Sequence, residues 1–168
     1  MEARKLSRSD TEGFQLSLRV RHPSMDPTEI SRAFKIEPEH SFRAGEARPA
    51  GGVANAAVHS ESYWLGMLSP MSDVADHLLF ATDPKPHIAE KQLAVLRRSL
   101  SFALSLRASR FFSTHAELLR RIRAEGGNVT LLVTVYDSDV GSFTLAPEAS
   151  RTFADLDIAV EFELEAGE

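Results

Sequence analysis

Residues 14–34, FQLSLRVRHPSMDPTEISRAF, contain the pattern that decides the fold. Between Phe14 and Val20 apolar residues alternate with polar ones, which is typical of a β-strand with one buried face and one polar face. The segment DPTE at 26–29 predicts a helix start, because Asp26 can cap the first backbone amides and proline fits the first helical turn. We therefore expect a strand followed by a short helix.

A similar arrangement recurs near the C-terminus. EISRAF at 29–34 and EASRTF at 148–153 agree at four of six positions, and each lies between two expected strands. The apolar residues of a long helix, expected from about 87 to 107, cover a broad arc, so this helix should lie across the sheet. The expected strands after the first are 40–44, 60–68, 129–136 and 157–164. The prediction is an α+β fold with a single mixed or antiparallel sheet, helices packed on one face, and two β-α-β halves flanking the long helix.

Length and composition fit one domain. A chain of 168 residues can bury a core of its own. We expect residues 13–165 to form this domain and residues 1–12 to be a flexible tail. The absence of cysteine excludes disulfides, zinc–thiolate sites and thiol nucleophiles. Without a secretory signal or an apolar run of about 18 residues, we expect a cytoplasmic protein that does not enter a membrane.

Familiar catalytic motifs are absent from the sequence. It contains no GxxxxGK or GxGxxG phosphate loop, no GxSxG elbow and no HExxH pair. Asp73 and His77 are four residues apart on an expected helix, but a local surface contact explains this spacing better than a metal site. We therefore expect no cofactor and no metal, and we favour binding over catalysis.

One face of the expected sheet is left without helices and is a candidate binding surface. The candidate ligand-binding residues there are Arg19, Arg21, Arg43 and Trp64. Trp64 has two interpretations, because its ring either packs in the core or stacks on a ligand from the open face. Glu161 and Glu163 lie on one face of the last expected strand. They are typical of a solvated strand face and could form ion pairs with the arginines of the first strand.

Charge is unevenly distributed along the chain. Residues 91–123 hold eight basic side chains and one acid, a local net charge of +7, which leaves −12 for the rest of a chain whose total is −5. The candidate basic surface consists of Arg97, Arg98, Arg120, Arg121 and Arg123. Such a segment could attract phosphates or an acidic protein. The alternative is a solvated helical face partly paired with acids from elsewhere.

Several short motifs resemble one known family. They are DPTEI at 26–30, IEP at 36–38, RAG at 43–45, Trp64, FTLAPE at 143–148 and LDI at 156–158. Together they resemble the uncharacterised bacterial family called domain of unknown function 4279, over roughly residues 14–164. The resemblance implies the fold and a bacterial origin, and the family has no established activity to transfer.

Three functions remain as hypotheses. The favoured one is a non-catalytic bacterial binding or regulatory domain that acts on a protein partner through its surface. The alternative is a domain that binds a small molecule or an anion on the open sheet face. The third is nucleic-acid binding through residues 91–123, which is less favoured because no known reading motif accompanies the charge. An edge strand or the open face could also form a homodimer.

Overall fold

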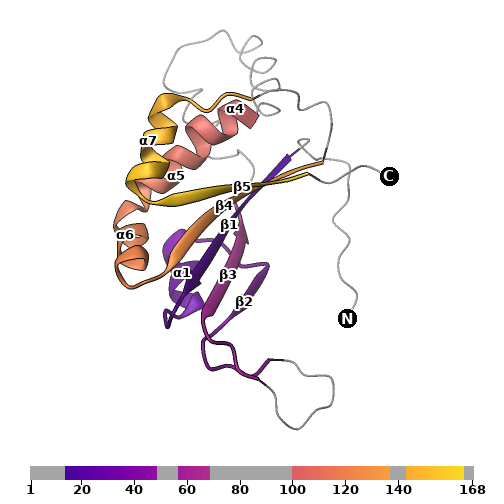
Figure 1. The fold of residues 1–168 in the computed structure, drawn as a ribbon, viewed down its shortest axis with the longest axis vertical. Helices are drawn as coiled ribbons and strands as arrows, with labels where there is room; N and C mark the ends of the chain where they lie inside the picture. The colour runs from indigo at the N-terminus through magenta and orange to yellow at the C-terminus, as the bar shows by residue number, and fades with distance from the viewer. Residues whose placement is uncertain (1–13, 49–56, 69–99, 137–142, 165–168) are drawn as a thin grey trace.

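The structure is a computed structural model that describes residues 14–48, 57–68, 100–136 and 143–164. Its five strands form one mixed sheet in the order β2-β3-β1-β4-β5 (Figure 1). Their bounds are β1 (Phe14–His22), β2 (His40–Phe42), β3 (Ser62–Met67), β4 (Asn128–Val135) and β5 (Ile158–Leu164). Neighbouring strands are antiparallel except for β4 and β5, which are parallel. The predicted α+β fold with one mixed sheet is confirmed.

The described helices pack on the sheet and lie beside the same face (Figure 1). They are α1 (Pro27–Phe34), α4 (Leu100–Phe102), the π-helical segment η2 (Ala103–Ala108), α5 (Ser109–Thr114), α6 (Ala116–Ala124) and α7 (Pro147–Asp155). Asp26 caps α1, because its Oδ1 accepts a hydrogen bond from the backbone N–H of Thr28 at 2.9 Å. The expected helix start at Asp26 is therefore confirmed.

The two β-α-β units differ in how their strands pair. β4 and β5 are direct parallel neighbours on either side of α7 in sequence. β1 and β2 run in the same direction, but β3 lies between them and is antiparallel to both. The first unit is therefore split by a strand that comes later in the sequence. Strand alternation alone did not predict this insertion.

The long helix differs from its predicted boundary. Residues 87–99 lie outside the described part of the chain, but from Leu100 the chain is helical to Thr114, beyond the expected end near 107. Burial explains the extension, since Phe112 is 0% exposed and packs edge-on against Phe153 of α7, with ring centroids 5.4 Å apart. The Thr114 hydroxyl donates to the carbonyl of Arg110, so it does not cap α6. The expected tail at residues 1–12 also lies outside the described residues.

The core lies between the helices and one face of the sheet. On β1 the buried apolar residues are every second one, and they face the matching residues of β4, as in the pairs Leu16 with Val133 and Leu18 with Leu131. This alternation leaves the other face of the sheet without a described helix. We call it the open face. Its central side chains come from β1, β3 and β4.

Candidate functional site

Arg19 projects onto the open face and is already paired. Its neighbours Leu18 and Val20 are buried on the helix-covered face, so alternation places Arg19 on the other side. Its Nη2 lies 2.5 Å from Oε2 of Glu161 on β5, and the pair therefore reaches across β4. The expected ion pair between the first and last strands is confirmed at this position. With only 22% of the Arg19 side chain exposed, little of its charge remains for a ligand.

Arg21 begins a column of stacked side chains on the open face. Its guanidinium carbon lies 5.9 Å from the ring centroid of Tyr63. Tyr63 stacks on Phe42 at 5.1 Å between centroids, and Phe42 stacks on His59 at 3.6 Å. We call these four residues the aromatic column. Because Phe42 has a ring on each side, the column anchors the short edge strand β2 to the sheet.

Sequence reasoning missed the aromatic column. Alternation assigns Phe42 and Tyr63 to a face of their own strands, but it does not give the register between strands. The column exists because Arg21 lies opposite Tyr63, and Tyr63 lies opposite Phe42. The signal in the sequence was limited to Phe42 in one expected strand and Tyr63, next to Trp64, in another.

A groove of about 340 Å³ runs beside the column. It is lined by Arg21, Phe42, Arg48, His59, Ser60, Glu61 and Tyr63. Arg21 is paired there with Glu61, with Nη1 and Oε1 3.1 Å apart. Arg48 has no ion pair with any described residue. A second groove, of about 410 Å³, follows α1 and includes Arg32 and Lys35.

Trp64 lies in the core, and the alternative in which it stacks on a ligand at the open face is wrong. Trp64 pairs with Val20, so it shares the helix-covered face and not the face of Arg19 and Arg21. Its side chain is 0% exposed, and Nε1 donates a 2.9 Å hydrogen bond to Oγ of Ser31 on α1. The ring also meets Phe34 edge-on at 5.5 Å. The indole therefore joins α1 to β3.

Arg43 has a structural contact that ties the end of β2 to α1. Its Nη2 lies 2.7 Å from Oδ2 of Asp26, the residue that caps the helix. The pKa of Asp26 is lowered, chiefly by the hydrogen bonds from the backbone N–H and the hydroxyl of Thr28, with the charge of Arg43 adding to them. Arg43 therefore completes a capping network and stands apart from the arginines of the open face.

The basic surface is only partly described, and much of its charge is neutralised. Arg97 and Arg98 lie outside the described residues. On α6, Arg121 binds the carboxylate of Glu29 on α1, which raises the pKa of Arg121, and Arg123 Nε lies 2.5 Å from Oδ2 of Asp157. Arg120 is exposed and has no ion pair with a described residue. Two of the three α6 arginines therefore connect elements of the fold.

Large exposed apolar side chains gather at the far end of β5. Residues of this strand on the helix-covered face become steadily more exposed, from 7% at Ile158 to 43% at Phe162 and 80% at Leu164. Phe143, 39% exposed, stacks on Phe162 with 5.0 Å between ring centroids. We call Phe143, Phe162 and Leu164 the β5 patch. Val58 is the only other large exposed apolar side chain among the described residues.

Each group with a shifted pKa value has a local structural explanation. Burial lowers the pKa of His115, with the charge of Lys35 adding to the effect, while Asp26 and Arg121 have the capping and pairing contacts given above. Within the described ranges, no three histidine or carboxylate side chains approach closely enough to hold a metal ion. Nor is any described helix both long and apolar enough to cross a membrane.

Comparisons with known proteins give no match. No family model matches the chain, and no curated protein or solved structure is similar enough to be matched. The resemblance to domain of unknown function 4279 therefore stays a prediction.

Proposed function

We propose that this chain is a non-catalytic protein-binding domain whose contact surface is the β5 patch. The main support for the proposal is that two rows of buried apolar side chains continue across the sheet onto β5, where they become exposed. Buried Leu16 and Val133 lie in one row across the sheet, and the next residue in that row is the exposed Phe162. Phe14 and Val135 lead in the same way to Leu164. Among the described residues, both apolar rows therefore end on β5 at exposed side chains.

The β5 patch holds three of the four large exposed apolar side chains of the described residues. Fully burying a leucine or phenylalanine side chain contributes about 1.5–3 kcal/mol, so covering three partly exposed ones would contribute on the order of a few kcal/mol. Proteins usually protect the end of a strand edge with charge or with a covering element, and contiguous apolar patches there mark contact sites. This energy is available to a partner protein that covers the end of β5.

The environments of the groups with shifted pKa values favour binding over catalysis. A catalytic site usually brings groups with shifted pKa values together in a cleft. Here Asp26, His115 and Arg121 each respond to a separate structural neighbour. Among the described residues they form no common acid–base pair.

The groove beside the aromatic column is a second candidate site. Arg48 and His59 line it, and the charge of Arg48 is not matched by a described acid. It could bind a small aromatic anion. Calorimetric titration with phenyl phosphate tests this, and Arg48→Ala should abolish any heat of binding. A wild-type chain that gives no heat at millimolar phenyl phosphate would exclude the groove as an anion site.

Quantitative affinity purification with matched surface variants tests the protein-binding proposal. The baits are wild type, Phe162→Ser/Leu164→Ser, and Val58→Ser as a control that removes an exposed apolar side chain elsewhere. We expect one protein at near-equal molar amount with wild type and with the control, and at least tenfold less with the double variant. Circular dichroism must show that all three baits are folded. Equal recovery by all baits would refute the proposal.

A further inference from the structure

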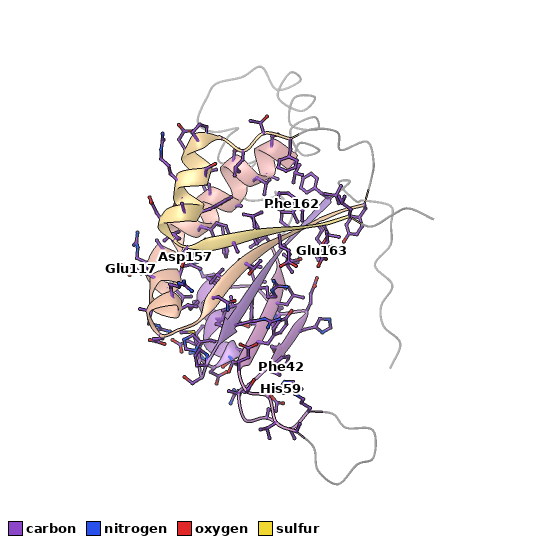
Figure 2. All side chains as sticks on the ribbon, viewed as in Figure 1. Phe42, His59, Glu117, Asp157, Phe162 and Glu163 are labelled. Carbon is purple, nitrogen blue, oxygen red and sulfur yellow. The ribbon has the colours of Figure 1, made fainter. Side chains whose placement is uncertain are left out.

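The outer edge of β5 has no strand beside it in the described part of the chain. β5 ends the sheet order and pairs only with β4, from Ile158 to Leu164. Half of its backbone N–H and C=O groups therefore face outward, in the arrangement that an added strand uses. Figure 2 shows Phe162 and Glu163 together near the end of this edge that lies away from α7. The edge thus combines backbone donors and acceptors with a distinctive set of side chains.

The side chains of β5 define what an added strand would have to present. On the helix-covered face, Phe162 and Leu164 are the last side chains of the two apolar rows described above. On the open face the outermost residues are Ala159, Glu161 and Glu163. A neighbouring strand that follows the pleat would alternate between meeting apolar rows and meeting carboxylates. Its side chains would have to match both.

Of the two glutamates on β5, Glu163 is the one that has no ion pair with a described residue. Glu161 is paired with Arg19 at 2.5 Å. The row that contains Glu163 continues through Thr134 on β4 and Gln15 on β1, and both of these residues are uncharged. Glu163 itself has no ion pair with a described residue. A basic side chain on an added strand would supply the opposite charge that this row lacks.

From these observations we infer that the partner contributes an extended segment in which basic residues alternate with apolar ones, and that this segment adds to β5 as a sixth strand. The inference rests on the proposed function and specifies the partner of the same surface. Main-chain hydrogen bonds would hold the segment, the β5 patch would receive its apolar residues, and Glu163 would select its charge. This mode of recognition needs no pocket.

A second copy of this chain fits the edge poorly. A symmetric antiparallel pair centred on residue 162 would place Glu161 opposite Glu163 of the other copy, and a pair centred on 161 would place Glu161 opposite itself. Like charges directly opposite each other destabilise a strand pair. A foreign strand with basic residues avoids this repulsion. Self-association through β5 is therefore an outcome that counts against the inference.

Two synthetic peptides test the inference on the full chain. The probe is a capped peptide of four lysine–valine repeats, and its control has four lysines followed by four valines. We expect the alternating peptide to bind at least tenfold more tightly, measured by fluorescence anisotropy, and to slow amide hydrogen exchange in β5. Glu163→Gln should weaken binding by about 1.5-fold to fivefold, and Glu163→Lys should shift the preference to a glutamate–valine peptide.

N-methylation separates strand addition from general attraction to lysine. Methyl groups on alternate amides should abolish binding when they lie on the side facing β5, and should have no effect when moved by one residue. Equal binding of the alternating and block peptides, insensitivity to the methyl position, or dimerisation through β5 would overturn the inference. If the peptides fail while Phe162→Ser/Leu164→Ser still removes the captured partner, the proposed function stands and only the strand-addition inference falls.

Discussion

Replacing Gly66 with alanine tests the packing that holds α1 against the sheet. Gly66 lies on the helix-covered face of β3, opposite Leu18, and the indole of Trp64 covers it. An added Cβ would lie 2.5 Å from Cη2 of Trp64 and 2.9 Å from Cγ2 of Ile36. Carbon atoms in contact are normally about 3.5–4.0 Å apart, so the ring would have to move by about 1 Å.

Trp64 has little room for such a movement. It is 0% exposed, its Nε1 donates a hydrogen bond to Ser31, and its ring packs against Phe34. Overpacking costs about 1–3 kcal/mol. Loss of the hydrogen bond from the indole adds to this cost, so we expect a destabilisation of about 2–3 kcal/mol from the displaced ring. Alanine is otherwise favoured over glycine in a strand by about 0.5–1 kcal/mol. The expected net destabilisation is therefore about 1–2.5 kcal/mol, or a decrease in Tm of about 2–10 °C.

Denaturant unfolding followed by tryptophan fluorescence measures this effect. Trp64 is the only tryptophan, so its emission reports on this site alone. Far-ultraviolet circular dichroism follows the same transition for Trp64→Phe, whose shorter ring leaves space for the new methyl group. In that background Gly66→Ala should cost at least 1 kcal/mol less, and the difference is the coupling energy of the two positions. An equal cost in both backgrounds, or a neutral change in wild type, would refute the reasoning.

Three further predictions concern single positions. Gly127→Ala should destabilise the chain by about 1–3 kcal/mol, because the added Cβ would lie 2.7 Å from Cδ2 of His22. Gly126→Ala should cost only about 1–2 kcal/mol, because its one penalty is an alanine at a φ of 86°. Asp157, at φ 53°, should tolerate asparagine but not valine, as thermal unfolding would show. The folded pKa of His115 is lowered, so the unfolded chain takes up the proton first. Wild type should therefore lose stability relative to His115→Gln as the pH falls below about 6.5, and a relative gain would contradict this sign.

The sequence predicted the elements whose information is local. The strand from Phe14 and the cap at Asp26 each depend on residues close together in the chain, and the structure has both. Thr114 shows where such reasoning fails. The residues 114–117 resemble a capping box, but the helix before them continues because Phe112 is held in the core. Tertiary packing therefore decided this boundary.

The candidate site was harder to predict because it depends on register. Alternation predicted the correct face for Arg19 and Arg21. It could not decide which face Trp64 occupies, because the strand of Trp64 is apolar on both sides. Pairing with Val20 resolved the choice. The β5 patch was missed for a different reason. Phe162 and Leu164 follow the same alternation as buried Ile158, but α7 lies beside the other end of β5 (Figure 1).

The charge asymmetry of the sequence suggests binding through charge, but the ion pairs in the fold argue against charge as the main source of binding energy. Five of the candidate arginines are paired in the fold with acids from other parts of the chain. The pairs are Arg19 with Glu161, Arg21 with Glu61, Arg43 with Asp26, Arg121 with Glu29, and Arg123 with Asp157. Exposed ion pairs contribute little to stability, about 0–1 kcal/mol each, but they remove the local excess of charge that would attract an anion. Within the described surface, the exposed apolar side chains at the end of β5 lie beside a strand edge that no described strand pairs with, and the protein strand that we propose would use both.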